Sequence, residues 1–416
     1  MICSNLLNIP KKIKFGYYSV GNLEFLSKLE AIQQDSKTKE GIKWHFNDAT
    51  FSSYDWTKEP EETLQELYGQ RALRIRKNYD YVVLWYSGGA DSHNVLMSFL
   101  QNKIHIDEIA VVDYSEADNK RNLGYWTDEV KITALIDINQ LRKELPDTLI
   151  RYIDITRDLP SIYQGENRWN WIYEQNCSLS PNNYFRSFTR EADAHYKKIV
   201  DSGKKMVFVW GSDKPKLTYK DNRYGIYFQD LVDSCVSTRT QILDRAWEHD
   251  ELFYWSADSV KILIKQAHTL IKFLRTAPLN HPDLVKLKGN SKVGDLGSIN
   301  RNNETYQLTR VGQSSIIYPW WPRHRFQQPK TFLTSYVLTP RDGWFYRDNH
   351  NETTKLARDA FFNGLEKIYS IVGDGWLNKK AKTKPKKYWF DTNLLDKFQA
   401  SNGLIGCVSK TYWLES

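Results

Sequence analysis

Four apolar runs, separated from one another by segments of helical periodicity, constrain the fold of this chain more than any other feature. The runs cover residues 79–86, 106–114, 147–155 and 204–213. The first, YDYVVLWY, is apolar almost throughout, as expected for a strand that is covered on both faces. Strands that alternate with helices favour right-handed βαβ units. The sequence therefore predicts an α/β fold built on a doubly wound, mainly parallel sheet.

Helical periodicity places the helices of this fold. A helix is expected from about Pro60 to Lys77, capped by Asp55 or Thr57, because apolar residues recur there at helical spacing and Pro60 suits a first turn. Further helices are predicted over about 91–100, 126–141, 186–200 and 259–274. The last of these carries a continuous apolar stripe, so one of its faces is expected to be buried.

The chain of 416 residues fits two or three domains. We expect residues 1–59 to form an N-terminal lead-in segment that packs on another part of the chain. Residues 60–275 should form the α/β domain. Residues 276–416 are aromatic-rich, and we expect an α-rich or irregular region of unknown role there.

Composition argues against several classes of protein. No stretch approaches the roughly 18 uncharged apolar residues of a membrane span, and the N-terminus makes a poor signal peptide, so a cytoplasmic location without a membrane partner is expected. The nine histidines show no paired ligand spacing, which disfavours a zinc site. A disulfide framework is disfavoured by the wide spacing of the cysteines, which are Cys3, Cys177, Cys235 and Cys407. The net charge of +8 attracts phosphates, in a nucleotide or a nucleic acid alike.

The residues with the clearest chemical meaning are SGGADS, at 87–92, between the first predicted strand and the next helix. Gly88 and Gly89 lack a Cβ, so the backbone can turn tightly and approach a polyphosphate closely. The start of the following helix offers unpaired N–H groups and the positive end of the helix dipole, which together bind anions. The hydroxyls of Ser87 and Ser92 add further donors. The sequence therefore predicts a phosphate-binding turn here.

Asp91 needs a separate explanation, because its carboxylate repels a phosphate. We expect this residue either to cap the helix or to bind magnesium. The turn matches neither GxxxxGK[ST] nor GxGxxG. A Walker A site and a nicotinamide or flavin Rossmann site are therefore disfavoured.

With a strand before it and a helix after it, the turn resembles the signature SGGxDS of the PP-loop ATP pyrophosphatases, the adenine nucleotide α-hydrolase-like enzymes, at all five defined positions. The resemblance implies an enzyme that uses ATP and Mg²⁺, cleaves ATP between its α and β phosphates and adenylates a substrate oxygen. A second nucleophile then displaces AMP. The end of the second strand, with Asp113 and Tyr114, would lie near adenine or ribose. The residues that the resemblance assigns to pyrophosphate are Ser87, Gly88, Gly89, Asp91 and Ser92.

A second polar group, Gly211–Lys214, ends the fourth predicted strand. We expect it to face the same crevice, because ligands in doubly wound sheets bind at the carboxyl ends of strands. Gly211 would contact the nucleotide, Asp213 would hold magnesium together with Asp91, and Lys214 would contact phosphate or the transition state. Asp91, Asp213 and Lys214 are thus the predicted catalytic residues. The alternative is a polar turn without a role in chemistry.

One side of the helix predicted over 259–274 is basic. Its four cationic residues are spaced by four, three and four positions, which places them opposite the apolar stripe. They are Lys261, Lys265, His268 and Lys272. A solvated face is the ordinary outcome of such a pattern. The alternative is that Lys265 or His268 reaches the phosphates.

Segments 44–68 and 248–256 resemble PP-loop proteins that are carried by bacteriophages and are often labelled asparagine synthase-like, so that the resemblance covers about 44–275. It implies a ligase that adenylates a carboxylate for amide or amine formation, in the host cytoplasm if the chain is viral. Ile2 follows Met1, and fewer than 80 residues precede the first predicted strand. We therefore expect no glutaminase domain, so ammonia or an amine would come from solution or from an amidotransferase partner.

Three other functions stay open. A PP-loop enzyme that modifies a nucleobase in tRNA or DNA would suit the positive charge, the aromatic surplus and the lysine-rich stretch 379–387. A phosphoadenosine phosphosulfate reductase-like enzyme would share the fold, but no Cys-containing C-terminal motif is present. A nucleotide-binding protein without catalysis is the third. The acceptor substrate and the oligomeric state do not follow from these residues.

Overall fold

The computed structural model describes most of the α/β region and parts of the chain on either side of it. The described residues are 16–113, 133–154, 193–211, 214–221, 223–230, 248–287, 298–301, 304–321, a few positions between 355 and 372, and 406–415. Parts of two predicted helices, 126–132 and 186–192, lie outside these residues, as does the stretch 379–387.

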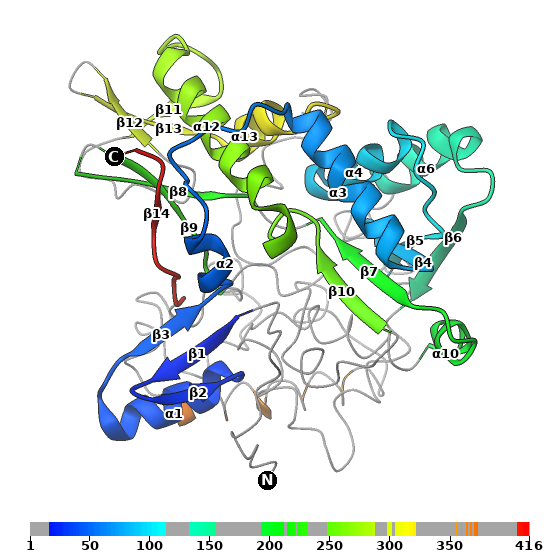
Figure 1. The fold of residues 1–416 in the computed structure, drawn as a ribbon, viewed down its shortest axis with the longest axis horizontal. Coiled ribbons are helices and arrows are strands. Elements are labelled where there is room, and N and C mark those ends of the chain that lie inside the picture. The colour runs from blue at the N-terminus through cyan, green and yellow to red at the C-terminus, as the bar shows by residue number, and fades with distance from the viewer. Residues whose placement is uncertain are drawn as a thin grey trace.

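A five-stranded sheet forms the core of the α/β part (Figure 1). Its strands are β4 (Tyr81–Trp85), β5 (Glu108–Asp113), β6 (Leu149–Asp154), β7 (Met206–Trp210) and β10 (Glu248–Leu252). They are ordered β10-β7-β4-β5-β6, and every neighbouring pair is parallel. The four predicted strands are therefore confirmed, and the parallel sheet flanked by helices is consistent with a Rossmann-like doubly wound fold. The fifth strand, β10, was not predicted.

The direction of winding reverses at β4. The chain runs from β4 outwards to β5 and β6 and then returns to the other side of β4 for β7 and β10. The carboxyl ends of β4 and β7 therefore flank the topological switch point of the sheet. In open α/β sheets this is the position at which ligands bind.

The helices follow the predicted pattern with shifted ends. They are α3 (Leu64–Asn78), α4 (Ala90–Leu100), α6 (Leu135–Leu141), α10 (Ala194–Asp201) and α12 (Val260–Thr276), with 3-10 turns η2 (Arg142–Glu144) and η4 (Ala257–Ser259). Helix α3 packs against α4 and α12. The predicted apolar stripe of α12 is buried, as its residues Val260, Leu263, Ala267, Leu270 and Leu274 show.

Helix α3 begins later than we predicted. The predicted start was Pro60 with Asp55 or Thr57 as the cap, but the helix begins at Leu64 and Thr63 is its cap. The Thr63 hydroxyl accepts from the Glu66 N–H, and the Glu66 carboxylate accepts from the Thr63 N–H at 2.7 Å. This capping box satisfies two N–H groups that have no intrahelical partner in a helix that begins at Leu64. Asp55 instead accepts from the N–H and hydroxyl of Thr57 in a separate turn.

The N-terminal lead-in segment has a structure of its own. Its elements are β1 (Tyr17–Val20), β2 (Leu23–Phe25), α1 (Lys28–Thr38), β3 (Ile42–His45) and α2 (Asp48–Ser52). The three strands form an antiparallel sheet in the order β2-β1-β3, which lies apart from the parallel sheet in Figure 1.

A buried ion pair joins this segment to two distant parts of the chain. Lys28 Nζ lies 2.7 Å from Asp230 Oδ2, and neither side chain is exposed. The Tyr18 hydroxyl donates to the same Asp230 oxygen at 2.9 Å, and the Cys407 N–H donates to the other at 2.8 Å. Residues from both ends of the chain therefore meet at one carboxylate.

The C-terminal region, for which we expected α-rich or irregular structure, contains several strands and a helix among its described residues. These are β11 (Leu284–Lys286), β12 (Ser298–Arg301), β13 (Glu304–Leu308), α13 (Arg310–Ile317) and β14 (Tyr412–Trp413). Strand β14 pairs antiparallel with β9 (Arg223–Tyr227), which pairs in turn with β8 (Lys216–Lys220). The Tyr412 ring also stacks on Trp56 with centroids 4.7 Å apart. Strand β14 therefore links the lead-in segment to the β8–β9 hairpin. Within the described part of the chain, no helix has the length and apolarity to cross a membrane.

Candidate nucleotide site at the switch point

The SGGADS turn leaves β4 at the switch point, and Gly88 fixes its shape. The φ angle of Gly88 is +79°, in the left-handed region that favours glycine. A Cβ at this position would lie 2.3 Å from Thr133 Oγ1 and 2.5 Å from the Ala134 nitrogen. Gly88 is therefore required both for the turn and for the close approach of the chain that begins α6.

The two serines of the turn bond to its own backbone. Ser87 Oγ accepts from the Gly89 N–H at 3.2 Å, and the Ser92 hydroxyl donates to the Gly89 carbonyl at 3.2 Å. The two hydroxyl oxygens lie 3.2 Å apart. These bonds hold the turn in one shape. The role of the Ser87 and Ser92 hydroxyls as donors to phosphate stays a prediction.

Helix α4 starts directly behind the turn, and its first residue is Ala90. Gly89 occupies the cap position and has no side chain to cap the helix, and Ser87 Oγ, which accepts from the Gly89 N–H, is the side chain that bonds to this end of the helix among the described residues. Asp91 lies in the first turn of the helix, so our expectation that it caps the helix is wrong. The Asp91 side chain projects from the helix toward other partners, and the amino end of α4 keeps the uncapped geometry that suits an anion.

Asp91 is held by two side chains that come from distant parts of the sequence. Lys214 Nζ lies 2.7 Å from Asp91 Oδ1 and 2.8 Å from Oδ2. The Tyr318 hydroxyl donates to Oδ1 at 2.5 Å. The side chains of Asp91 and Lys214 are 29% and 16% exposed, so this ion pair is open to solvent on one side. The structure thus brings together the two predicted residues Asp91 and Lys214.

Gly211 explains how the two strand ends come so close. It follows β7, and a Cβ on it would meet the Asp91 carbonyl carbon and oxygen at 2.9 Å. Gly211 and Lys214, the described residues of the predicted group 211–214, therefore do face the SGGADS turn. Asp213, the second predicted magnesium ligand, and Ser212 lie outside the described residues. The backbone of Asp113 ends β5, whereas its side chain and Tyr114 also lie outside them.

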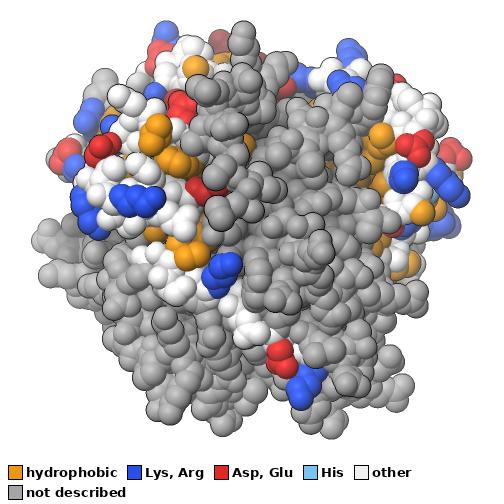
Figure 2. Space-filling model, turned by 90° about the horizontal axis from the view of Figure 1, so that it is seen from below, with side chains coloured by type: hydrophobic (Ala, Val, Ile, Leu, Met, Phe, Trp, Pro, Cys, Tyr) orange, Lys and Arg blue, Asp and Glu red, His pale blue; other side chains and the backbone are white. Residues whose placement is uncertain are grey.

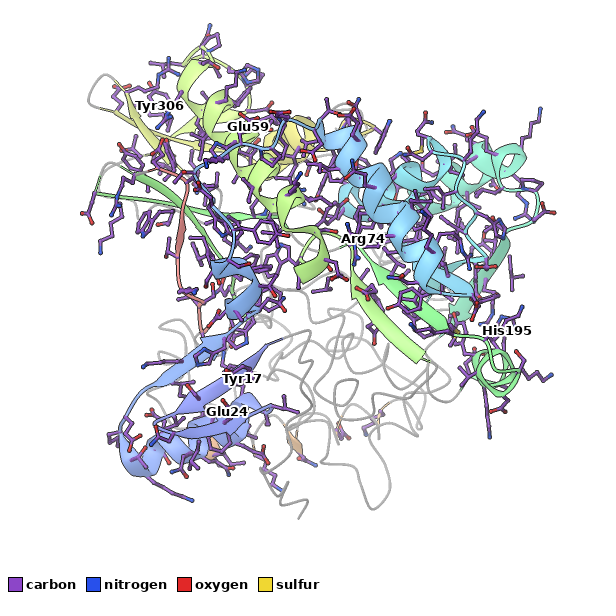
Figure 3. All side chains as sticks on the ribbon, in the orientation of Figure 1. Tyr17, Glu24, Glu59, Arg74, His195 and Tyr306 are labelled. Atoms are coloured by element: carbon purple, nitrogen blue, oxygen red, sulfur yellow. The ribbon has the colours of Figure 1, made fainter. Side chains whose placement is uncertain are left out.

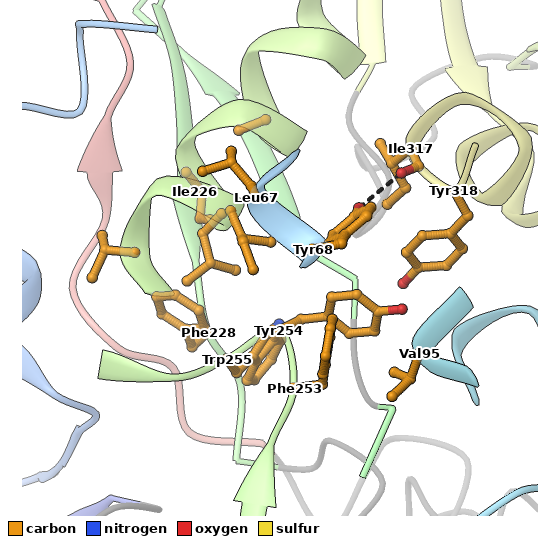
Figure 4. Packing of buried hydrophobic residues seen from close by; sticks show 14 of the residues in the cluster. Leu67, Tyr68, Val95, Ile226, Phe228, Phe253, Tyr254, Trp255, Ile317 and Tyr318 are labelled. Atoms are coloured by element: carbon orange, nitrogen blue, oxygen red, sulfur yellow. Dashed lines mark hydrogen bonds between the residues drawn. The ribbon is translucent and has the colours of Figure 1, made fainter. Parts of the chain in front are cut away.

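Three buried tyrosines stand behind Asp91. The rings of Tyr254 and Tyr318 stack with centroids 5.2 Å apart, and Tyr68 meets Tyr254 edge to face at 5.7 Å. Figure 4 shows the hydroxyl ends of Tyr254 and Tyr318 next to each other, beside the helix that carries Val95. Tyr254 donates to the Asp91 main-chain carbonyl at 2.9 Å. The cluster therefore supports both the backbone and the side chain of Asp91.

Burial is the main cause of the altered acidity of these tyrosines. It raises the pKa of Tyr68, Tyr254 and Tyr318 well above the usual range for a phenol, and the negative charge of Asp91 raises each pKa further. The three hydroxyls therefore stay protonated at neutral pH, which lets Tyr318 act as a hydrogen-bond donor to the carboxylate.

Another buried polar group lies next to the turn. Tyr86, the residue before Ser87, donates to Asp137 Oδ2 at 2.6 Å. His93 Nδ1 lies 3.0 Å from the Tyr86 hydroxyl and 3.2 Å from Asp137 Oδ2. In the tautomer that is protonated at Nδ1, His93 donates into this pair. The bonds connect the end of β4, α4 and α6.

The basic face of α12 contacts the lead-in segment. Lys265 Nζ lies 2.7 Å from a carboxylate oxygen of Glu59, a residue that Figure 3 labels beside α12, and it donates to the Pro60 carbonyl at 2.9 Å. His268 donates to the Trp56 carbonyl at 3.0 Å, and Lys261 pairs with Glu62. Lys265 and His268 are partly buried, whereas Lys261 and Lys272 are exposed, so the solvated face that the charge pattern favoured is found at two of the four positions. The predicted contact of Lys265 with phosphate stays a prediction.

The described residues hold few groups that bind a metal by themselves. No cluster of three or more His, Cys, Asp or Glu side chains occurs within the described ranges. Magnesium that accompanies nucleotide phosphates needs only one or two protein carboxylates, because phosphates and water complete its shell. Asp91, which is partly exposed at the amino end of α4, fits one of these ligand positions.

Sequence reasoning missed Tyr318, Tyr254 and the Tyr86–His93–Asp137 group. Tyr318 follows α13 in a stretch without clear periodicity, and no motif surrounds it. Tyr254 lies in the segment 248–256, whose resemblance to PP-loop proteins was the available signal. No family model matches the chain, and no curated protein matches it significantly. The geometry is therefore the basis for any statement about function.

Proposed function

We propose that this chain is an ATP pyrophosphatase-type adenylating enzyme of the PP-loop kind. A substrate oxygen attacks the α phosphorus of ATP, the bond between the α and β phosphates breaks, and pyrophosphate leaves. An ammonia or amine nucleophile then displaces AMP from the adenylated substrate, which forms an amide or amine as in asparagine synthase-like enzymes.

The observation that carries this proposal is the meeting of Lys214 with Asp91 at the switch point. The glycine-rich turn after β4 and the chain after β7 come from the two strands that flank the reversal of the sheet. A cation, a carboxylate and the uncapped amino end of α4 lie together there. This combination suits a leaving pyrophosphate, whose growing charge needs fixed N–H donors and a cation.

Each residue then has a role in the proposed reaction. Gly88 and Gly89 let the backbone approach the phosphates, while Ser87 and Ser92 hold the turn. Lys214 exchanges Asp91 for a phosphate oxygen. Asp91 is freed to hold the magnesium ion that the nucleotide brings, which supplies further positive charge to the leaving group when bound.

The sharpest test identifies the products from ATP. The full chain, ATP and magnesium are incubated with separate pools of amino acids, transfer RNA or DNA, each with and without ammonium. We expect AMP and pyrophosphate, with turnover stimulated by the pool that contains the acceptor. ADP and phosphate, or no turnover with any pool, would contradict the proposal.

The Asp91→Asn variant connects this activity to the site. The asparagine keeps the size of the side chain but has no charge for Lys214 or magnesium, so we expect turnover to be lost while the far-ultraviolet circular dichroism spectrum stays unchanged. Full activity in this variant would remove Asp91 from the site.

The pool that stimulates turnover also separates the proposed amide-forming enzyme from a nucleic-acid-modifying one. On the face seen in Figure 2, the described Lys and Arg side chains are interspersed with Asp and Glu rather than gathered in one patch. Binding to nucleic acid that weakens steeply with salt would favour the second class, because such binding depends on contacts to phosphates.

A further inference from the structure

The chain around α13 reaches the Asp91–Lys214 pair with two buried side chains. Residues 310–318 come from the C-terminal region, outside the part of the sequence that resembles PP-loop proteins. Neither Tyr318 nor Gln313 is more than slightly exposed. The Tyr318 hydroxyl donates to Asp91, and the Gln313 side chain donates to the carbonyl of Pro215, the residue after Lys214.

We propose that residues 310–318 form a second wall of the nucleotide site, in which Tyr318 and Gln313 are positioning residues that set Asp91 and Lys214 for the pyrophosphate group of a nucleoside triphosphate. This inference rests on the proposed function, and it extends the site into the C-terminal region.

Tyr318 is suited to a site in which Lys214 changes partners. Asp91 accepts from Lys214 on both carboxylate oxygens and from the Tyr318 hydroxyl on one. When Lys214 moves to a phosphate, the hydroxyl remains on the carboxylate and limits the cost of losing the cation. Lys214 Nζ also lies 5.5 Å from the centre of the Tyr318 ring, so it stays near the ring's negative face.

The backbone next to Tyr318 is fixed from behind. The Tyr68 hydroxyl donates to the Ile317 carbonyl at 2.8 Å, and Figure 4 draws this bond. The stack on Tyr254 restrains the ring of Tyr318 itself. The Tyr318 hydroxyl is therefore held at one position before any nucleotide arrives, which is the property of a positioning residue.

Gln313 fixes the chain that carries Lys214. Its side-chain NH₂ donates to the Pro215 carbonyl at 3.2 Å. Its side-chain oxygen is buried and has no hydrogen-bond partner among the described residues. Gln313 therefore tethers the residue after Lys214. An apolar side chain would fill the same space without burying an unpaired oxygen, so the hydrogen bond to Pro215 is what the glutamine adds.

The first experiment compares Tyr318→Phe with Tyr196→Phe. Tyr196 is also buried and its hydroxyl also donates to a carboxylate, that of Glu108 at 2.7 Å, but Glu108 begins β5 and so lies at the amino end of the sheet, away from the switch point. The probe is inorganic pyrophosphate with magnesium, and calorimetry gives its Kd. Without the Tyr318 hydroxyl, Lys214 must leave a carboxylate that has lost its other donor. We expect the Kd to rise about tenfold in Tyr318→Phe and to change less than about twofold in Tyr196→Phe.

The second experiment compares Gln313→Leu with Gln266→Leu. Both glutamines are fully buried and both have an unpaired side-chain oxygen. Each substitution removes one hydrogen bond and one unpaired polar atom, so we expect both variants to fold normally. The Kd for magnesium pyrophosphate should rise about threefold or more in Gln313→Leu, because Lys214 then loses its tether, and stay unchanged in Gln266→Leu.

The outcomes separate the two proposals. If the wild-type chain binds pyrophosphate but each variant matches its control, the second wall is wrong while the proposed function stands. If the wild-type chain binds neither pyrophosphate nor ATP, the proposed function fails first and the role of residues 310–318 fails with it. Urea unfolding of all four variants shows whether a change in Kd merely follows a loss of stability.

Discussion

A methyl group on Gly211 would lie 2.9 Å from both the carbonyl carbon and the carbonyl oxygen of Asp91. Gly211 ends the approach of β7 to the switch point, and Asp91 lies in the first turn of α4. The atoms that such a methyl group meets belong to the backbone, so they cannot rotate away as a flexible side chain would. The contact between these two residues sets how closely the predicted phosphate turn and the chain that carries Lys214 approach each other.

The first prediction concerns Gly211→Ala. The added methyl group forces the start of α4 away from the end of β7, and overpacking of this kind costs about 1–3 kcal/mol of unfolding free energy. We expect urea denaturation to show this loss and ATP turnover to fall with it, because Lys214 and Asp91 move apart. A Gly211→Ala variant as stable and as active as the wild type would show that a methyl group fits between the end of β7 and the Asp91 backbone without displacing either.

The second prediction concerns Lys214→Met, with Lys261→Met as its control. Methionine keeps the length of the side chain without its charge. Loss of a preorganised cation at a leaving group costs about 100-fold or more in turnover, so we expect a loss of this size in Lys214→Met. Lys261 is 53% exposed and pairs with Glu62, and an exposed pair of this kind contributes little.

We therefore expect Lys261→Met to keep its turnover within about twofold of the wild type, since exposed pairs are worth only about 0–1 kcal/mol. Initial rates of AMP formation measure both variants. Equal rates for the two would show that Lys214 does not act on the nucleotide.

The third prediction concerns the buried pair of Lys28 and Asp230. In Lys28→Met the Asp230 carboxylate stays buried without a cation. Among the described residues, the Tyr18 hydroxyl and the Cys407 N–H then remain as its hydrogen-bond donors. Removing one partner of a buried ion pair costs about 3–5 kcal/mol, so the free energy of unfolding should fall by that amount. Chemical denaturation of the single variant and of Lys28→Met with Asp230→Leu provides the measurement.

The double variant should recover part of the loss, because no unpaired charge remains in it. A single variant as stable as the wild type would mean that the segments at the two ends of the chain are held together by their apolar contacts alone.

The fourth prediction concerns alkaline pH. Burial raises the pKa of Tyr68, Tyr254 and Tyr318 in the folded protein, whereas the pKa of a tyrosine in the unfolded chain is about 10. Above that pH the unfolded chain binds fewer protons than the folded one, so the free energy of unfolding falls as the pH rises. Below it, these tyrosines cause no dependence on pH.

Absorbance of phenolate and circular dichroism, followed together during the titration, test this fourth prediction. We expect the last tyrosines to ionise only as the tertiary structure is lost. Complete ionisation with an intact near-ultraviolet spectrum would contradict the burial of the cluster.

Local sequence was enough to predict the parallel sheet, because its evidence lies within short windows. The run at 79–86 is apolar throughout its centre, and the glycines of the following turn mark the point where the strand must end. Strand β10 escaped prediction because EHDEL carries four polar residues of five. Arg71, which is 180 residues away in the sequence, contacts Glu251 of this strand at 2.8 Å. The Trp210 ring N–H donates to Asp250 at 2.6 Å.

The candidate site divides in the same way. Asp91 was predicted from the SGGADS motif and Lys214 from its place at the end of an apolar run. Tyr318 was not predicted, because the residues around it have neither a repeat nor a motif. Lys265 was predicted from its position on a basic helix face, and the tertiary structure adds Glu59 within 2.7 Å of it, a partner that the helical spacing could not indicate.

The sequence by itself determined where four strands of the parallel sheet and the main helices form. It also determined that the chain turns at Gly88 and Gly89, because hydrophobic spacing and glycine act over a few residues. The tertiary structure alone decided that Tyr318 donates to Asp91 and that Lys265 pairs with Glu59. It also decided that residues from both ends of the chain meet at Asp230. These choices depend on distances between residues that lie far apart along the chain, and such distances exist only once the core has packed.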